Sequence, residues 1–296
     1  MSDRKALDAN GREIPLIKEY RIDKLRKCLE CVNEHPFNRE KQRECILELY
    51  PGKSEKSVFR GMVIPSLRHL GLVLGYGSFI RLSANGKIIV ESKSVSDELH
   101  QRVMRAVIYE IDERKFLFMP ILTHITNLEN FVPIKNGVQN IASMITAPSQ
   151  RQKMERINHW LSVLEQVELI RKNDLEEITV NVNNYKQTLS DFNLNGVKAE
   201  KFKDYLFDTY FVLRKETAGV VDIAELREKV GIKMLRDDKA ILTESQFDKM
   251  LRLIPFATDD YIISLGRPMG AEEKIFEHKG KHFRTFSLQL LRKEIK

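Results

Sequence analysis

The chain has 296 residues, of which 42% are hydrophobic and 31% charged, with 49 Lys and Arg against 42 Asp and Glu. This apolar content excludes a wholly disordered chain, and no run of about 18 uncharged apolar residues is present, which excludes a membrane-spanning helix. The N-terminus lacks the apolar segment of a secretory signal, so we expect a cytoplasmic protein. The three cysteines, Cys28, Cys31 and Cys45, fit a reducing compartment without a disulfide framework.

The positive charge is concentrated at the two ends of the chain. Residues 1–27 carry a net charge of +3 and residues 267–296 a net charge of +4, whereas residues 28–266 sum to zero. Basic ends around a neutral body favour a polyanionic partner such as nucleic acid. Residues 1–19 of the first basic end form an N-terminal arm, which Pro15 predicts to be extended.

Residues 20–96 show the element order of a winged helix-turn-helix. A helix runs from Tyr20 to Pro36, a second follows its cap Asn38, and a third opens at Ser54 and is kinked or split by Pro65. Two β-rich runs, 79–82 and 87–90, flank the turn Ser83-Ala84-Asn85-Gly86, which is a hairpin signal. Three helices followed by a hairpin predict a first winged helix over 20–96.

The same order recurs twice with less regularity. Residues 97–183 hold a helix from Ser96, one after Pro120, an inserted stretch at 131–148, a helix capped by Ser149 and a strand near 176–182. We interpret this part as a linker or a degenerate winged-helix subdomain, and 184–197 as a polar linker. Residues 198–296 hold a helix, a short strand at 220–223, a helix closed by Gly231, a helix capped by Thr243, and strands at 261–266 and 281–289. They predict a C-terminal winged helix, and the fold class is mainly helical α+β.

The third helix of a helix-turn-helix enters the major groove of DNA, where Arg and Lys read guanine and Asn and Gln read adenine. The candidates at the starts of the third helices are Lys53, Ser54, Lys56, Ser57 and Arg60, then Gln150, Arg151, Gln152, Lys153 and Arg156, then Ser245, Gln246, Lys249 and Arg252. The candidates for phosphate contacts are Arg12, Lys18 and Arg21 in the arm, Arg81 and Lys87 in the first wing, and Lys279, Lys281 and Arg284 near the C-terminus.

Other signals are weaker. Cys28, Cys31, His35 and Cys45 resemble a zinc site, but Cys28 falls on the apolar stripe of its helix, so we favour a core position. Glu91 and Lys93 resemble the strand end of a metal-dependent nuclease, yet nearby acids all lie on predicted helices, and we place both in the exit strand of the wing. We expect Trp160, Phe79 and Tyr185 in the core. No motif of an active site or cofactor site is present.

Four runs of the sequence carry a resemblance to a known family. The runs KSVFRGMVIPSLRHLGLV (56–73) and FIRLSANGKIIVESKS (79–94), followed by MERINHWLSVLEQVELIRK (154–172) and ITVNV (178–182), resemble the DNA-recognition domains of type IIS restriction endonucleases of the FokI and BpuJI kind. The resemblance covers the order of elements over about residues 15–185. It implies tandem winged helices that bind duplex DNA sequence-specifically, with cleavage supplied by a separate Mg²⁺-dependent nuclease domain or subunit that has no matching segment here.

The sequence therefore predicts a site-specific binder of double-stranded DNA without a cofactor of its own. The alternative is a winged-helix scaffold for proteins in transcription or replication. That alternative predicts weak, sequence-indifferent DNA binding beside a tight protein partner. A degenerate nuclease site at Glu91 is a third possibility and requires Mg²⁺-dependent cleavage.

Overall fold

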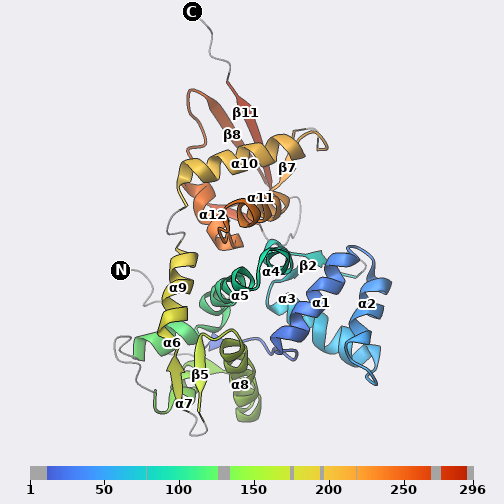
Figure 1. Cartoon of the computed structure of the whole chain (residues 1–296), viewed down its shortest axis with the longest axis vertical. Helices are drawn as coiled ribbons and strands as arrows, with labels where there is room; N and C mark the ends of the chain where they lie inside the picture. The colour runs from blue at the N-terminus through green and yellow to red at the C-terminus, as the bar shows by residue number, and fades with distance from the viewer. Residues whose placement is uncertain are drawn as a thin grey trace, which may run out of the picture.

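The chain folds into a mainly helical α+β structure in which the sheets are small, with two or three strands each (Figure 1). The computed structural model describes residues 12–77, 79–125, 134–173, 177–193, 197–217, 219–267 and 275–291. One hydrophobic core extends from Ile14 to Phe192, with Leu235 and Ile241 packed into it, and a second is built from residues between Phe202 and Leu288. The first two predicted units thus share a core, and the third has its own.

The first unit comprises residues 22–82. Its elements are α1 (Ile22–Glu34), α2 (Arg39–Glu48), the π-helical segment η2 (Lys56–Val63), α3 (Ile64–His69), β2 (Val73–Leu74) and β3 (Arg81–Leu82). The predicted cap Asn38 accepts a hydrogen bond from the Lys41 backbone N–H, which confirms the start of α2. Pro65 was predicted to kink or split the third helix, but the backbone stays helical through Val63 and Ile64. The helix changes there from the π-helical η2 to α3, and Pro65 lies in the first turn of α3.

The second unit comprises residues 118–180. Its elements are α6 (Phe118–Ile125), α7 (Gly137–Met144), β4 (Ile145–Thr146), α8 (Gln150–Gln166), β5 (Ile170–Lys172) and β6 (Ile178–Val180). The strands β5 and β6 are antiparallel, and Ile134, between α6 and α7, forms an antiparallel bridge to Ile178. Residues 126–133, which include part of the predicted second helix, lie outside the described residues.

The third unit comprises residues 199–290. Its elements are α10 (Ala199–Leu213), β7 (Val221–Asp222), α11 (Ile223–Asp238), α12 (Glu244–Leu253), β8 (Tyr261–Gly266), β9 (Phe276–His278), β10 (Lys281–Phe283) and β11 (Thr285–Leu290). The order in the three-stranded sheet is β7-β11-β8, so the last strand lies between the other two. The predicted strand over 281–289 is divided into β10 and β11.

Three further helices connect the units. They are α4 (Ala84–Val95) and α5 (Asp97–Ile111), followed by the short π-helical η3 (Asp112–Phe116), and α9 (Val182–Phe192). Figure 1 shows α4 and α5 in the middle of the molecule, and α4 packs against α5 and against α11 of the third unit. The predicted linker at 184–197 is thus wrong for most of its length, because α9 buries Tyr185 and Phe192 in the first core.

The predicted first hairpin is wrong, because residues 83–86 begin a helix. The Ser83 hydroxyl accepts a hydrogen bond from the Gly86 N–H at 3.2 Å and caps α4, which contains the run predicted as the second strand. A Cβ at Gly86 would lie 2.2 Å from the Leu72 carbonyl oxygen, so glycine permits close packing there and does not mark a turn. The hairpin lies one segment earlier, between β2 and β3.

Gly231 does not end its helix as predicted. The helix α11 continues to Asp238, and Gly231 is buried in its middle. A Cβ at this position would lie 3.4 Å from the Ile88 side chain of α4 and 3.3 Å from the Leu242 carbonyl oxygen. The glycine therefore permits the close approach of α11 to α4 and to the segment around Leu242.

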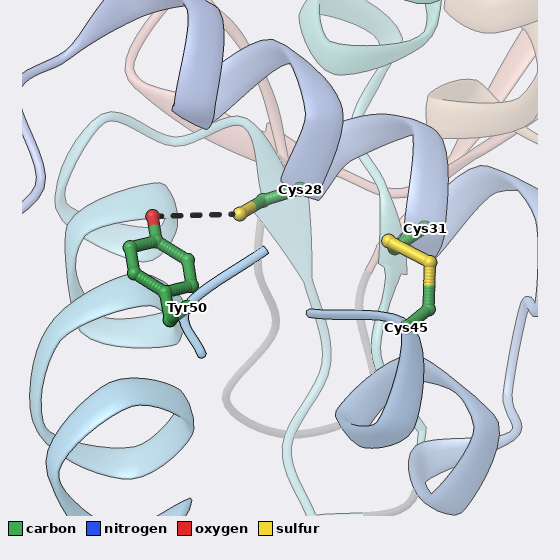
Figure 2. Close-up of a disulfide and its surroundings, with 4 residues drawn as sticks. All are labelled: Cys28, Cys31, Cys45 and Tyr50. Carbon is green, nitrogen blue, oxygen red and sulfur yellow. Dashed lines mark hydrogen bonds between the residues drawn. A yellow bond between two sulfur atoms is a disulfide. The ribbon is translucent and has the colours of Figure 1, made fainter. Parts of the chain in front are cut away.

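The prediction of no disulfide is also wrong. Cys31 of α1 and Cys45 of α2 are bonded to each other across 14 residues, as Figure 2 shows. The remaining thiol, Cys28, is buried, and its sulfur lies 3.9 Å from the Tyr50 hydroxyl. Burial raises the pKa of Cys28 to about 12. Cys28 is therefore a core residue, as predicted, and stays protonated near neutral pH.

None of the helices in the described ranges is both long enough and apolar enough to cross a membrane.

Candidate nucleic-acid interface

The N-terminus of α8 presents polar side chains to solvent. Ser149 accepts a hydrogen bond from the Gln152 N–H at 3.2 Å, which confirms the predicted cap. The side chains of Gln150, Arg151 and Gln152 are all exposed. Two amides and a guanidinium beside the unpaired N–H groups of a helix start combine base-reading chemistry with attraction for anions.

The rest of α8 is held by neighbouring segments. The Lys153 ammonium donates to the Ala142 carbonyl at 3.0 Å, and the Arg156 guanidinium donates to the Ile14 carbonyl at 2.6 Å. The His159 Nδ1 lies 2.8 Å from the Ile17 carbonyl oxygen. The prediction that Lys153 and Arg156 read the groove is therefore wrong. Both are anchoring residues, because their charged groups bind the protein's own backbone.

The predicted arm is part of the fold. Arg12 lies in β1 (Arg12–Glu13), which is extended as predicted and pairs in parallel with β4. Ile14 and Ile17 are buried, and the Ser66 hydroxyl accepts from the Lys18 and Glu19 N–H groups at 3.1 and 3.0 Å. From Ile14 onward the segment therefore cannot move as a separate arm, although the Lys18 side chain is exposed.

Glu19 forms a buried ionic site in this segment. Its carboxylate accepts from the Arg21 guanidinium at 2.8 and 2.6 Å and from the Tyr50 hydroxyl at 2.6 Å. Burial raises the pKa of Glu19, but the hydrogen bonds from Arg21 and Tyr50 outweigh it, and the net effect lowers the pKa. Arg21 is half exposed but engaged with Glu19, which reduces its capacity as a phosphate contact.

The third helix of the first unit also begins with exposed residues. The exposed candidates are Lys53, Ser54, Lys56, Ser57 and Arg60. The Ser54 hydroxyl accepts from the Ser57 N–H at 3.3 Å and caps this turn. The Arg60 guanidinium lies 3.2 Å from the Glu55 carboxylate, so an acidic group partly offsets the positive charge here.

The third helix of the third unit is closed to DNA at its start. Gln246 is completely buried, with its amide N–H donating to the Asp191 carbonyl at 2.6 Å, and Glu244 is 5% exposed. The Glu244 N–H donates to the Asn85 side chain at 2.9 Å, and the Ser245 N–H donates to the Glu110 carboxylate at 3.3 Å. The prediction that Ser245 and Gln246 read the groove is therefore wrong. Both lie at the junction of α12 with the neighbouring segments.

The later turns of α12 are more open. Lys249 is exposed, and its ammonium lies 4.3 Å from the centre of the Phe192 ring of α9. The guanidinium of Arg252 donates to the Glu277 carbonyl at 2.7 and 3.0 Å. Both cations lie beyond the first turn and are not brought together with the exposed residues of α8.

One predicted wing residue does not lie in a wing, and another pairs with an acid. Lys87 lies in α4, and its ammonium donates to the Asn33 side chain and lies 3.8 Å from Glu91. Arg81 does lie in a hairpin strand, but its guanidinium lies 3.8 Å from the Glu228 carboxylate of α11. Glu91, predicted in an exit strand, is likewise in α4.

The basic C-terminal candidates lie on a hairpin. Lys279 and Lys281 are exposed at the turn between β9 and β10, where Lys279 and Gly280 have φ angles of 49° and 69°. Arg284 pairs with Asp222 at 2.9 Å. The two lysines therefore remain available as phosphate contacts, whereas Arg284 fastens β11 to β7.

Sequence reasoning missed two groups of residues. Asn85 and Glu110 form the junction with α12, and their partners are more than a hundred residues away, so no local pattern marks them. Tyr76 and Phe79 are 67% and 71% exposed at the tip of the β2–β3 hairpin. The Gly-Tyr-Gly run 75–77 was a local turn signal. The prediction of Phe79 in the core is thus wrong, while Trp160 and Tyr185 are buried as predicted.

Within the described ranges, the His, Cys, Asp and Glu side chains form no group of three or more that could hold a metal ion. Comparisons of the chain with family models, with curated proteins and with solved structures find no match.

Proposed function

We propose that the protein binds double-stranded DNA at specific sequences through tandem winged helices, in the manner of the recognition domain of a type IIS restriction endonuclease. DNA cleavage then comes from a nuclease domain or subunit outside the residues described here, with Mg²⁺ as the metal of that separate part. The chain's own role is to select the site.

The winged-helix assignment rests on the order of elements. In the third unit, a helix, a strand, two helices and four strands follow one another, and the first strand, β7, pairs with the last, β11. The second unit repeats this order, with the bridge of Ile134 to Ile178 in place of the first strand. In the first unit, the Phe37 N–H donates to the Ile80 carbonyl at 3.2 Å at the equivalent point. This order is typical of winged helices.

The start of α8 carries the proposal. Gln150, Arg151 and Gln152 are exposed behind a satisfied cap, while Arg156 and His159 anchor the following turns. An anchored helix with exposed amide and guanidinium groups at its start suits bidentate reading of base edges in a major groove. The exposed lysines at the start of η2 and at the β9–β10 turn supply candidate phosphate contacts.

A salt titration tests the proposal. Fluorescence anisotropy of a labelled random duplex is measured between about 50 and 200 mM salt, where several phosphate contacts lower affinity by orders of magnitude. We expect K279A/K281A to reduce the slope of log affinity against log salt by about 2, roughly one for each lysine that no longer meets a phosphate. The variant K215A, which changes an exposed lysine that is not a candidate DNA contact, keeps the slope of the unaltered protein. A salt-independent affinity contradicts the proposal.

A further inference from the structure

A cavity of about 420 Å³ lies where three parts of the molecule meet. Its lining includes Arg68 and Tyr76 of the first unit, Arg114 and Lys115 of η3, and Ile275 of the third unit. Its volume falls within the range of about 300–1,000 Å³ that is typical of small-molecule sites, which occur preferentially at such junctions.

Tyr76 offers an aromatic surface beside this cavity. The Arg68 guanidinium lies 4.5 Å from the centre of the Tyr76 ring and donates to the Gly75 carbonyl at 2.9 Å, which fixes the hairpin tip. Gly75 has a φ of 83°, and a Cβ there would lie 1.8 Å from the Phe79 carbonyl oxygen, so the tip requires glycine. The ring is thus held in place while remaining 67% exposed.

The cavity is lined by more cations than carboxylates. Arg68, Arg114 and Lys115 face one acid, Glu110, which is 2% exposed and accepts from Asn85 at 3.1 Å. The Arg114 side chain is 59% exposed, although it also contacts Ser245 and Glu110. The Lys115 ammonium donates to the His69 carbonyl. The lining therefore favours an anion.

A second junction cavity provides a contrast. It has a volume of about 450 Å³, between the first and third units, and its charged lining is balanced. The cations are Arg81, Lys87 and Lys229, and the acids are Asp222, Glu225 and Glu228. Of these two cavities, only the one beside Tyr76 combines an exposed aromatic ring with excess positive charge.

We propose that the cavity beside Tyr76 binds a nucleotide. The base stacks on the Tyr76 ring, whose position Arg68 fixes, and the phosphate accepts a hydrogen bond from Arg114. Lys115, whose ammonium donates to the His69 carbonyl, adds positive charge beside the phosphate. The nucleotide is either free in solution or part of the DNA strand, since both carry the same base and phosphate chemistry. This site is separate from the start of α8 and does not depend on the proposed function.

The first arm of the test uses a free nucleotide. Titration of the full chain with mant-ATP is followed by fluorescence, with mant-adenosine as the analogue without phosphates. We expect Y76A to weaken mant-ATP binding at least tenfold, in line with stacking contributions in other proteins, and Y76F to retain it. The matched control F79A removes an equally exposed aromatic ring from the same hairpin, outside the cavity lining, and leaves binding unchanged.

The second arm uses a duplex that contains 2-aminopurine, whose fluorescence rises when the base leaves the stack. A rise that disappears in Y76A and is kept in F79A identifies a DNA nucleotide as the ligand. Binding of mant-ATP that depends on Tyr76, without such a rise in the duplex, identifies a free nucleotide, and tighter binding of mant-ATP than of mant-adenosine shows that the phosphates contribute. If neither signal depends on Tyr76, the inference is overturned. Failure of the unaltered chain to bind any duplex, with mant-ATP still bound, removes the proposed DNA function but leaves this inference standing.

Discussion

Gln152 of α8 and Gln246 of α12 occupy the same position in two similar helices, yet their surroundings are opposite. Each is the third helical residue after a capping hydroxyl, Ser149 or Thr243, and each donates its N–H to that hydroxyl. Gln152 is exposed, whereas Gln246 has no exposed surface and bonds to Asp191. The local sequence sets the helix start, but the neighbouring units decide whether that start can meet DNA.

The largest expected effect is a difference in stability between variants of these two glutamines. We expect Q246A to lower the free energy of unfolding by about 2–3 kcal/mol, because it removes buried hydrogen bonds to Thr243 and Asp191. The matched variant Q152A changes it by less than about 0.5 kcal/mol, as is usual for exposed sites. Urea unfolding measures both, and equal destabilisation of the two variants contradicts the comparison.

A smaller effect concerns how α8 is held. We expect R156A to lower the free energy of unfolding by about 1–2 kcal/mol, since the charged hydrogen bond to the Ile14 carbonyl disappears. R151A, a change of the same residue type in the exposed turn, leaves stability nearly unchanged. A change of base preference in R156A without loss of stability contradicts the anchoring role and restores the residue as a reader.

The smallest expected effect is a change of stability with pH, which occurs only in acid. The lowered pKa of Glu19 means that its stabilising contribution is complete above the usual value of 4.5 and is lost as the pH falls through the lower pKa of the folded state. The difference in unfolding free energy between the unaltered protein and E19Q should therefore narrow as the pH falls below 4.5. Urea unfolding at neutral pH and in acid tests this, and a constant difference shows that Glu19 does not titrate with folding.

Much of the helical framework was predictable because its signals are local. Asn38, Ser149 and Thr243 were identified as caps, and each accepts the expected backbone hydrogen bond. The change of helix type beside Pro65 is consistent with the missing N–H of proline. Strands at 221–222 and 261–266 also lie where alternation and β-branched residues predicted them.

The remaining features depend on partners far away in the sequence. The run Ser83 to Gly86 has the composition of a hairpin turn. Asn85, however, is buried and forms hydrogen bonds to the Glu110 carboxylate and the Glu244 N–H, which stabilise a helix start instead of the turn. Likewise, Lys153 and Arg156 have the side chains of groove readers, and only the packing of neighbouring segments against α8 reveals their engagement. For the candidate interface, the sequence therefore supplied the residue types, whereas tertiary packing determined their availability.

We propose that the start of α8 reads DNA, and selection of bound sequences from a random duplex pool tests this claim most directly. We predict that the unaltered chain enriches a short motif. We also predict that R151A loses preference at one position of that motif, by about 1–3 kcal/mol. No enriched motif, or the same motif with equal preference in R151A, would contradict the claim.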